Sequence, residues 1–146
     1  MVIALFGENC TGKSSVAALV AQALDAKVYN GRDYLRLAKS ESEAKALFCA
    51  LLSQAVEGEQ TVIYVISEEE QLALLPVGAR RVLVTASIDR ICERFAKRMR
   101  GQLPPPVRAR LERDHGKFDA QPHELRLCSD MQSPEEGCAA VLALCR

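Results

Sequence analysis

The chain of 146 residues carries 19 basic and 19 acidic residues, and 49% of its residues are hydrophobic. This balance predicts a single domain with a sizeable core and excludes the strongly basic surface of a protein that coats nucleic acid. Apolar runs are too short to span a membrane, and the first residues lack a signal peptide's basic segment. Six cysteines without a CxxC pair, with only two histidines, argue against a zinc site. We expect a reduced, cytoplasmic protein that binds neither membranes nor nucleic acid, in an oligomeric state that the sequence leaves open.

Short apolar runs alternate with helical patterns along the whole chain. Strands are expected at residues 2–6, 26–30, 61–67, 80–86 and 123–129, and helices at 13–24, 44–55, 88–99 and 134–145. This alternation predicts a five-stranded parallel sheet in a three-layer α/β/α sandwich that spans residues 1–146. Ligands of such sheets bind at the carboxyl ends of the strands.

The segment directly after the first expected strand, Gly7-Glu-Asn-Cys-Thr-Gly-Lys-Ser14, matches the pattern GxxxxGK[ST]. Its glycines let successive backbone amides face phosphate oxygens, and the helix that follows adds its positive end. Lys13 is expected to bridge the β- and γ-phosphates of ATP catalytically, and Ser14 to be a ligand of Mg²⁺. The residues expected to bind the nucleotide are Gly7, Asn9, Cys10, Thr11, Gly12, Lys13, Ser14 and Ser15.

A carboxylate and a guanidinium follow the second expected strand at helical spacing. Asp33 and Arg36 lie three residues apart, which places them on one face of a helical turn. The carboxylate can orient or deprotonate a substrate hydroxyl, and the arginine can hold an anionic group of the same substrate. The alternative interpretation is an exposed pair that stabilises only the turn.

The third expected strand ends without the aspartate that many nucleotide-binding sheets place there. Ser67 and Glu68 stand at this end, and Glu68 can replace the missing carboxylate by holding Mg²⁺ through water. The alternative is that Ser67 and Glu70 form a capping box at the start of a helix. The sequence does not decide whether this departure abolishes turnover.

Residues 80–113 contain ten basic and three acidic residues, which makes this segment far more positive than the rest of the chain. Arg94 and Arg98 lie opposite the apolar stripe of the helix expected at 88–99. After Gly101 and a run of prolines, Arg110 and Arg113 recur on a short helix. The pattern predicts a mobile flap at about residues 100–117, which we call the LID, that carries arginines to a phosphoryl group. A solvated helix face is the alternative.

Four stretches together resemble the nucleoside-monophosphate kinase and shikimate kinase branch of the P-loop kinases. They are "GENCTGKSSVAALVAQAL", "GRDYLR", "IDRICERFAKRMRG" and "HELRLCSD". The resemblance implies a P-loop NTPase fold with a small LID. "GRDYLR" is similar to the adenylate kinase stretch whose arginine binds the phosphate of the acceptor, and shikimate kinases place a substrate-binding aspartate near the same point.

The same resemblance assigns roles to four arginines and reveals one departure. Arg94 and Arg98 match an arginine pair that precedes the LID, and Arg110 and Arg113 match LID arginines that reach the transferring phosphoryl group. After the third strand, however, "VISEEEQ" contains neither the Gly-Phe-Pro-Arg segment of adenylate kinases nor the glycine triplet of shikimate kinases.

The sequence therefore predicts an ATP-dependent kinase that transfers the γ-phosphoryl group of MgATP to a small molecule. A nucleoside monophosphate is the first choice of acceptor, because of Asp33 and Arg36, and a hydroxylated small acid or sugar is the second. A non-catalytic, ATP-binding regulatory module is the rival. The expected catalytic residues are Lys13, Asp33, Arg94, Arg98, Arg110 and Arg113, and the expected substrate-binding residues are Asp33 and Arg36.

Overall fold

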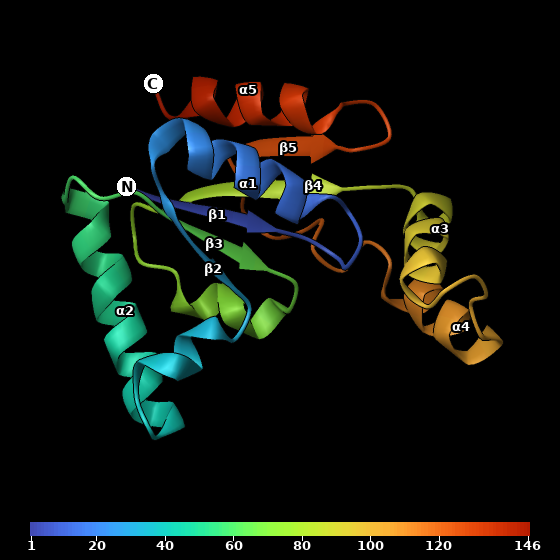
Figure 1. Cartoon of the computed structure of the whole chain (residues 1–146), viewed down its shortest axis with the longest axis horizontal. Helices are drawn as coiled ribbons and strands as arrows, with labels where there is room; N and C mark the ends of the chain where they lie inside the picture. Colours follow the sequence, from blue (N-terminus) through green and yellow to red (C-terminus); the bar gives the residue numbers. More distant parts are fainter.

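The computed structural model describes residues 1–146 as a five-stranded parallel sheet with helices on both faces (Figure 1). The strands are β1 (Val2–Phe6), β2 (Lys27–Asn30), β3 (Val62–Ile66), β4 (Arg80–Thr85) and β5 (Leu125–Cys128), in the spatial order β2-β3-β1-β4-β5. The helices are α1 (Lys13–Leu24), α2 (Glu41–Glu57), α3 (Ile88–Arg98), α4 (Pro105–Asp114) and α5 (Pro134–Leu144), with two 3-10 helices, η1 (Asp33–Leu37) and η2 (Glu69–Leu74). The predicted three-layer α/β sandwich is confirmed.

The three central strands are buried on both faces, which explains their uninterrupted apolar sequences. On one face, Leu5 and Val84 belong to a cluster completed by α1 and α5, with Val20 and Val141 at its centre. On the other face, α2 covers the sheet and buries Phe48 among aromatic residues. Figure 1 shows α1 and α5 together on one side of the sheet and α2 with both 3-10 helices on the other.

Serine hydroxyls cap the first turn of three helices. The hydroxyl of Ser133 accepts a hydrogen bond from the amide of Glu136, whose side chain binds back to the amide of Ser133, so the capping box is complete. Ser40 and Ser87 also accept bonds from amides of the first turn of α2 and α3. These caps fix where the helices begin along the sheet edge.

The expected capping box of Ser67 and Glu70 is wrong. Helix η2 begins one residue later than that box requires, its N-cap residue is Glu68, and no side chain caps it. The hydroxyl of Ser67 therefore has no structural role at a helix start and stays available at the end of β3.

Helices α3 and α4 project from one end of the sheet (Figure 1). The segment at about residues 100–117, for which the sequence predicts a mobile LID, contains the turn between these helices and α4. The chain turns between them at Arg100 and Gly101, both of which have positive φ. Behind α4 the chain returns to the core at Phe118, which is only 1% exposed and packs its ring against Phe6. None of the helices combines the length and the apolar character that crossing a membrane would need.

Candidate active site

The loop between β1 and α1 wraps closely against the neighbouring strand. A Cβ atom added at Gly7 would lie 2.2 Å from the carbonyl oxygen of Val84, so only glycine fits there. Cys10 and Gly12 adopt positive φ angles of 64° and 97°, and Gly12 is the N-cap residue of α1. A glycine-rich loop that takes such a path directly before a helix is the arrangement that binds phosphate through backbone amides.

Lys13 is buried at the base of this loop, with only 5% of its surface exposed. Its Nζ donates hydrogen bonds to the carbonyl oxygens of Gly7, at 2.9 Å, and Glu8. Burial is the main reason why the pKa of Lys13 falls from 10.5 to about 8. Keeping the ammonium group of Lys13 charged is therefore costly in the free protein, and a bound anion would stabilise its charged form.

A cavity of about 330 Å³, which we call the loop cavity, opens above Lys13 at the carboxyl ends of β2 and β3. Its wall includes the hydroxyls of Ser14 and Ser67 and the guanidinium of Arg98, which makes no ion pair in the structure. No carboxylate lines it. The full wall consists of Asn9, Cys10, Thr11, Gly12, Lys13, Ser14, Ser15, Asn30, Gly31, Val65, Ser67 and Arg98. An anion in this cavity meets two cations and the start of a helix.

Seven of the eight residues predicted to bind the nucleotide line this cavity; Gly7 lies below it and serves as the acceptor of the Lys13 hydrogen bond. Arg98 comes from α3, 84 residues further along the chain than Ser14, and the fold brings it to the loop as predicted from the helix pattern. Cys10 points into a small apolar cluster with Ala86 and Ile91, which fastens the loop to the base of α3.

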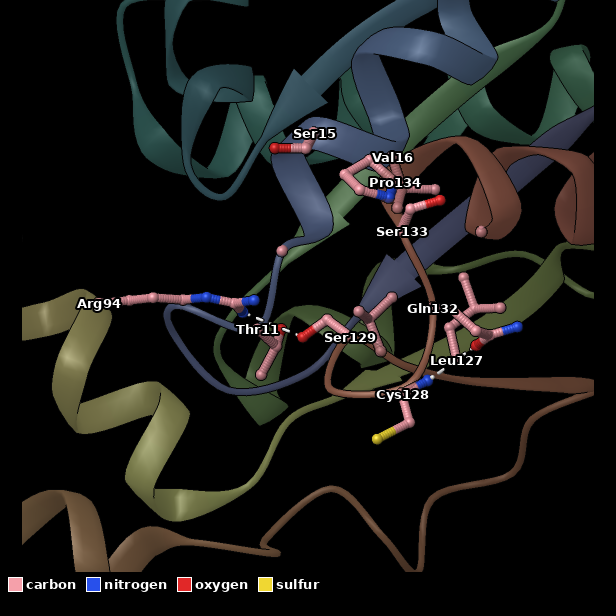
Figure 2. Close-up of a pocket in the computed structure, with 13 residues that line it drawn as sticks. Thr11, Ser15, Val16, Arg94, Leu127, Cys128, Ser129, Gln132, Ser133 and Pro134 are labelled. Atoms are coloured by element: carbon pink, nitrogen blue, oxygen red, sulfur yellow. Dashed lines mark hydrogen bonds between the residues drawn. The ribbon is translucent and has the colours of Figure 1, made fainter.

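Arg94 lies elsewhere, beside a smaller pocket of about 100 Å³ between the loop and the connection from β5 to α5. We call it the α5 pocket. Figure 2 shows Arg94 reaching from α3 toward Thr11 and Ser129, and its Nη1 donates to the carbonyl of Cys10 and to the hydroxyl of Ser129, both at 3.0 Å. Arg94 therefore joins two walls of the site and does not border the loop cavity.

The α5 pocket has an apolar side, formed by Val16 and Leu127, and a polar rim. In that rim the side-chain oxygen of Gln132 accepts a hydrogen bond from the amide of Cys128 at 3.1 Å, which orders the connection after β5. The amide of Ser87 donates to a carboxylate oxygen of Asp130. Hydrogen bonding by the side chain of Ser87 and by this amide lowers the pKa of Asp130. The pocket is thus tied to α3 through Ser87 as well as through Arg94.

Asp33 and Arg36 lie on η1, next to the loop cavity but not in its wall. A carboxylate oxygen of Asp33 accepts a hydrogen bond from the amide of Asn30 at 2.9 Å and so closes the turn after β2. Arg36 is exposed and makes no hydrogen bond or ion pair with another side chain. Their substrate-binding roles stay predictions.

Arg110 and Arg113 lie on α4 with most of their side chains exposed, and each approaches a carboxylate oxygen of Asp114 at 3.9 Å. Arg110 borders a hollow of about 370 Å³ between α3, α4 and the loop, whereas Arg113 borders none of the hollows described here. Neither reaches the loop cavity in this arrangement, and their roles in phosphoryl transfer stay predictions.

Several residues of the site escape prediction from the sequence. They are Asn30 and Gly31 at the end of β2, and, at the end of β5 and behind it, Cys128, Ser129, Gln132, Ser133 and Pro134. Each group directly follows a strand, so the rule that ligands bind at the carboxyl ends of strands points to them. Their exact partners depend on contacts over long chain distances, such as Arg94 with Ser129.

The sequence matches no protein-family model and no curated protein. Solved structures do resemble the fold over almost its full length. Shikimate kinase from Aquifex aeolicus aligns over 99% of this chain and 96% of its own, at 19% identity and a TM-score of 0.62. A gluconokinase from Sinorhizobium meliloti aligns over 98% and 92%, at 16% identity and a TM-score of 0.63.

The YorR protein from Bacillus subtilis, solved in complex with phosphorylated GDP, also aligns over 99% of this chain and 95% of its own, at 20% identity and a TM-score of 0.60. These similarities, at low sequence identity, concern the fold. The chain therefore has the fold of the P-loop kinases of the shikimate kinase type.

Proposed function

We propose that the protein is an ATP-dependent kinase that transfers the γ-phosphoryl group of ATP to a small molecule. The observation that carries this proposal is the loop cavity, where buried Lys13 and the unpaired Arg98 face the same space from different elements. A phosphate chain on the loop amides would place its terminal group between these two cations. Phosphoryl transfer needs positioning and charge stabilisation more than covalent help, and the site supplies both.

The α5 pocket supports the assignment of the nucleoside part of ATP to the opposite end of the loop. It adjoins the loop through Thr11 and Gly12 and offers apolar surface beside polar groups. Arg94 borders it, which favours a role for this arginine in positioning the nucleotide. Arg98 is then the arginine best placed to stabilise the transferring group, and Arg110 and Arg113 join it only if the LID closes.

The residues present suit a magnesium ion that arrives with ATP. Ser14 is exposed in the wall of the loop cavity, and its hydroxyl is a hard oxygen ligand. The structure contains no group of three or more His, Cys, Asp or Glu side chains that could hold a metal by themselves. Ser14 would thus complete a coordination sphere of phosphate and water oxygens, and the ion would neutralise phosphate charge.

The acceptor we propose is a hydroxylated small molecule. The similarity to a shikimate kinase and to a gluconokinase supports this class. A nucleoside monophosphate is the second candidate, supported by the similarity to YorR, which was solved in complex with phosphorylated GDP. Arg36 on η1 is the cation that the sequence assigns to the phosphate of such an acceptor. A non-catalytic ATP-binding module is supported by the absence of a carboxylate from the loop cavity.

The test is the release of ADP from MgATP with a panel of acceptors. The panel holds the nucleoside monophosphates, shikimate, gluconate, simple sugars and a control without acceptor. We expect one hydroxylated compound to raise ADP release well above the control and Lys13→Ala to abolish this increase. Lys27→Ala, which removes an exposed lysine at the amino end of β2, is the matched control and should keep it.

Each other outcome has a defined meaning. Full transfer by Lys13→Ala contradicts the proposal. Stimulation by nucleoside monophosphates alone supports the second candidate. Tight ATP binding without ADP release with any compound supports the non-catalytic module.

A further inference from the structure

The loop between β1 and α1 carries a carboxylate of its own, that of Glu8. This side chain does not border the loop cavity. It borders the hollow of about 370 Å³ between α3, α4 and the loop, which we call the LID hollow, and it is only 12% exposed. No role described above uses this carboxylate, although the next residue, Asn9, belongs to the wall of the loop cavity.

His115, the C-cap residue of α4, holds the carboxylate of Glu8. Its Nδ1 lies 3.1 Å from Oε1 of Glu8, although the two residues are 107 positions apart in the sequence. A carboxylate only accepts hydrogen bonds, so Nδ1 is the donor. His115 is the only side chain that makes a hydrogen bond or an ion pair with Glu8.

The chain on both sides of His115 fixes the position of its ring. The amide of His115 donates to the carbonyl of Glu112 at 3.4 Å, and Gly116 follows with a positive φ of 85°. Three residues after His115, Phe118 is buried and packs its ring against Phe6. The histidine therefore reaches the loop from a segment that is anchored in the core.

Without His115, the carboxylate of Glu8 would be attracted to the loop cavity. Asn9 borders both hollows, so only the width of the loop separates them. The cavity presents the ammonium of Lys13 and the guanidinium of Arg98, which makes no ion pair, and opposite charges a few ångströms apart attract. Burial lowers the pKa of Lys13, and the charge of Glu8 is among the smaller influences that oppose this shift. Glu8 thus acts on Lys13 even from its present position.

A carboxylate inside the loop cavity would take the place of a phosphate. It would neutralise Lys13 and Arg98, and it would repel the negative charges of a phosphate chain. The cationic character of the cavity therefore depends on the direction in which the side chain of Glu8 points.

We infer that His115 is a positioning residue that keeps the loop cavity free for an anion by holding the carboxylate of Glu8 in the LID hollow. His115 favours nucleotide binding in this way without contacting the nucleotide. The inference deepens the proposed function and rests on it for the identity of the ligand. The position of Glu8, however, can be measured without any ligand.

The first measurement follows the titration of Lys13 in the free protein by NMR. Its ¹³Cε signal is the one that disappears in Lys13→Met, and its midpoint should lie at about pH 8. His115→Phe keeps an aromatic ring but removes the donor, so the released carboxylate of Glu8 should move the midpoint upward. His115→Asn, whose side-chain amide can replace Nδ1 as donor, should keep the midpoint of the wild type.

The second measurement is the affinity for MgATP by calorimetry at neutral pH. We expect His115→Phe to weaken binding about tenfold, because Glu8 then repels the phosphate chain. Glu8→Gln removes the charge and keeps the shape, so Glu8→Gln combined with His115→Phe should bind MgATP as the wild type does. His123→Phe is the matched control, because it makes the same change at an exposed histidine whose Nδ1 lies beside the carbonyl oxygen of Gln121.

The double variant distinguishes positioning from a merely structural role. If it binds MgATP as weakly as His115→Phe does, His115 acts through the fold and the inference is overturned. An unchanged Lys13 midpoint and an unchanged affinity in His115→Phe overturn it as well, and His115→Ala repeats the test if the phenylalanine variant does not fold. If the wild type binds no ATP, the kinase proposal fails. The inference then stands if the double variant removes an upward shift of the Lys13 midpoint, and falls if no shift occurs.

Discussion

The two halves of the sheet's carboxyl edge, the loop after β1 and the segments η1 and η2, offer a ligand different kinds of contact. Around the loop after β1, the side chains of Lys13, Thr11 and Arg94 donate hydrogen bonds to backbone carbonyls, so the path of the backbone is already fixed inside the protein. Around η1 and η2, side chains form the wall of a hollow, and the side chains of Gln71, Lys45 and Glu70 have no partners. A preorganised backbone suits phosphate, which every nucleotide shares. Unpartnered side chains suit the part of a ligand that differs between enzymes.

Replacing Arg98 by methionine should have the largest effect of the variants considered, and that effect should be confined to the loop half of the edge. Arg98 faces the loop cavity, where charge develops during transfer, so Arg98→Met should lower kcat by about 10²–10³ and change the acceptor KM little. Steady-state kinetics with saturating ATP measures both constants. Arg126→Met, an exposed change on β5, serves as control, and a loss of kcat as large in that control would remove Arg98 from the site.

The lowered pKa of Lys13 predicts a pH dependence specific to the loop. The folded pKa of about 8 lies below the unfolded value of 10.5, so the unfolded chain binds the proton more tightly between these pH values. The free energy of unfolding should therefore rise between about pH 8 and 10.5, by roughly 3 kcal/mol relative to Lys13→Met. Urea denaturation of both proteins without nucleotide measures the difference, which a constant gap across this range would contradict.

The same titration weakens ATP binding. Above about pH 8 the free protein loses the charge of Lys13, so the affinity for ATP should fall by up to tenfold per pH unit.

Arg94 tests how firmly the loop and the α5 pocket are joined. Arg94→Met removes the bonds to the carbonyl of Cys10 and the hydroxyl of Ser129, and we expect the KM for ATP to rise about tenfold. Ser129→Ala removes only one of these bonds and should have a smaller effect. Nucleotide titration by calorimetry gives the same comparison for binding alone. An effect of Ser129→Ala as large as that of Arg94→Met would show that the serine itself contacts the nucleotide.

Replacing each of two tyrosines by phenylalanine should give the smallest difference in stability, and this comparison isolates a single hydrogen bond. The hydroxyl of Tyr64 donates to Gly31, whereas the buried hydroxyl of Tyr29 has no partner. Tyr64→Phe should therefore destabilise the protein by about 1 kcal/mol, and Tyr29→Phe should be neutral or stabilising. Urea midpoints of the two variants decide this. Equal destabilisation by both variants would mean that the ring environment, and not the hydrogen bond, sets the effect.

The sequence predicts those parts of the molecule that local rules determine. The predicted bounds of the strands lie within two residues of the observed ones, because strands buried on both faces, such as Val62–Ile66, are continuous apolar runs in the sequence. The phosphate loop can be predicted because its two glycines and Lys13 lie within one short segment of the sequence. The wrong capping box at Ser67 shows the limit, since a local pattern was present but the chain formed a 3-10 helix one residue later.

The hollow between η1, the start of α2 and η2 could not be predicted because no local rule describes it. Arg32, Lys45 and Gln71 meet only after β2 and β3 pair and α2 docks on the sheet. The burial of Gln71 is equally invisible in "SEEEQLALL", where the residue looks like part of a polar turn. Arg36, which the local pattern does favour, ends on the exposed side of η1.

The anchoring of the LID has a consequence for protein engineering. Ile91 on α3 and Phe118 behind α4 are each only 1% exposed, so both ends of the excursion are fastened to the body of the protein. Between them, residues 97–102 are exposed and include the turn at Arg100 and Gly101. The excursion can therefore be treated as an interchangeable cassette: a longer flap from another kinase, joined within residues 99–104, leaves both anchors intact. Such chimaeras would show whether the reaction, or only the exclusion of water, depends on the arginines that the native flap carries.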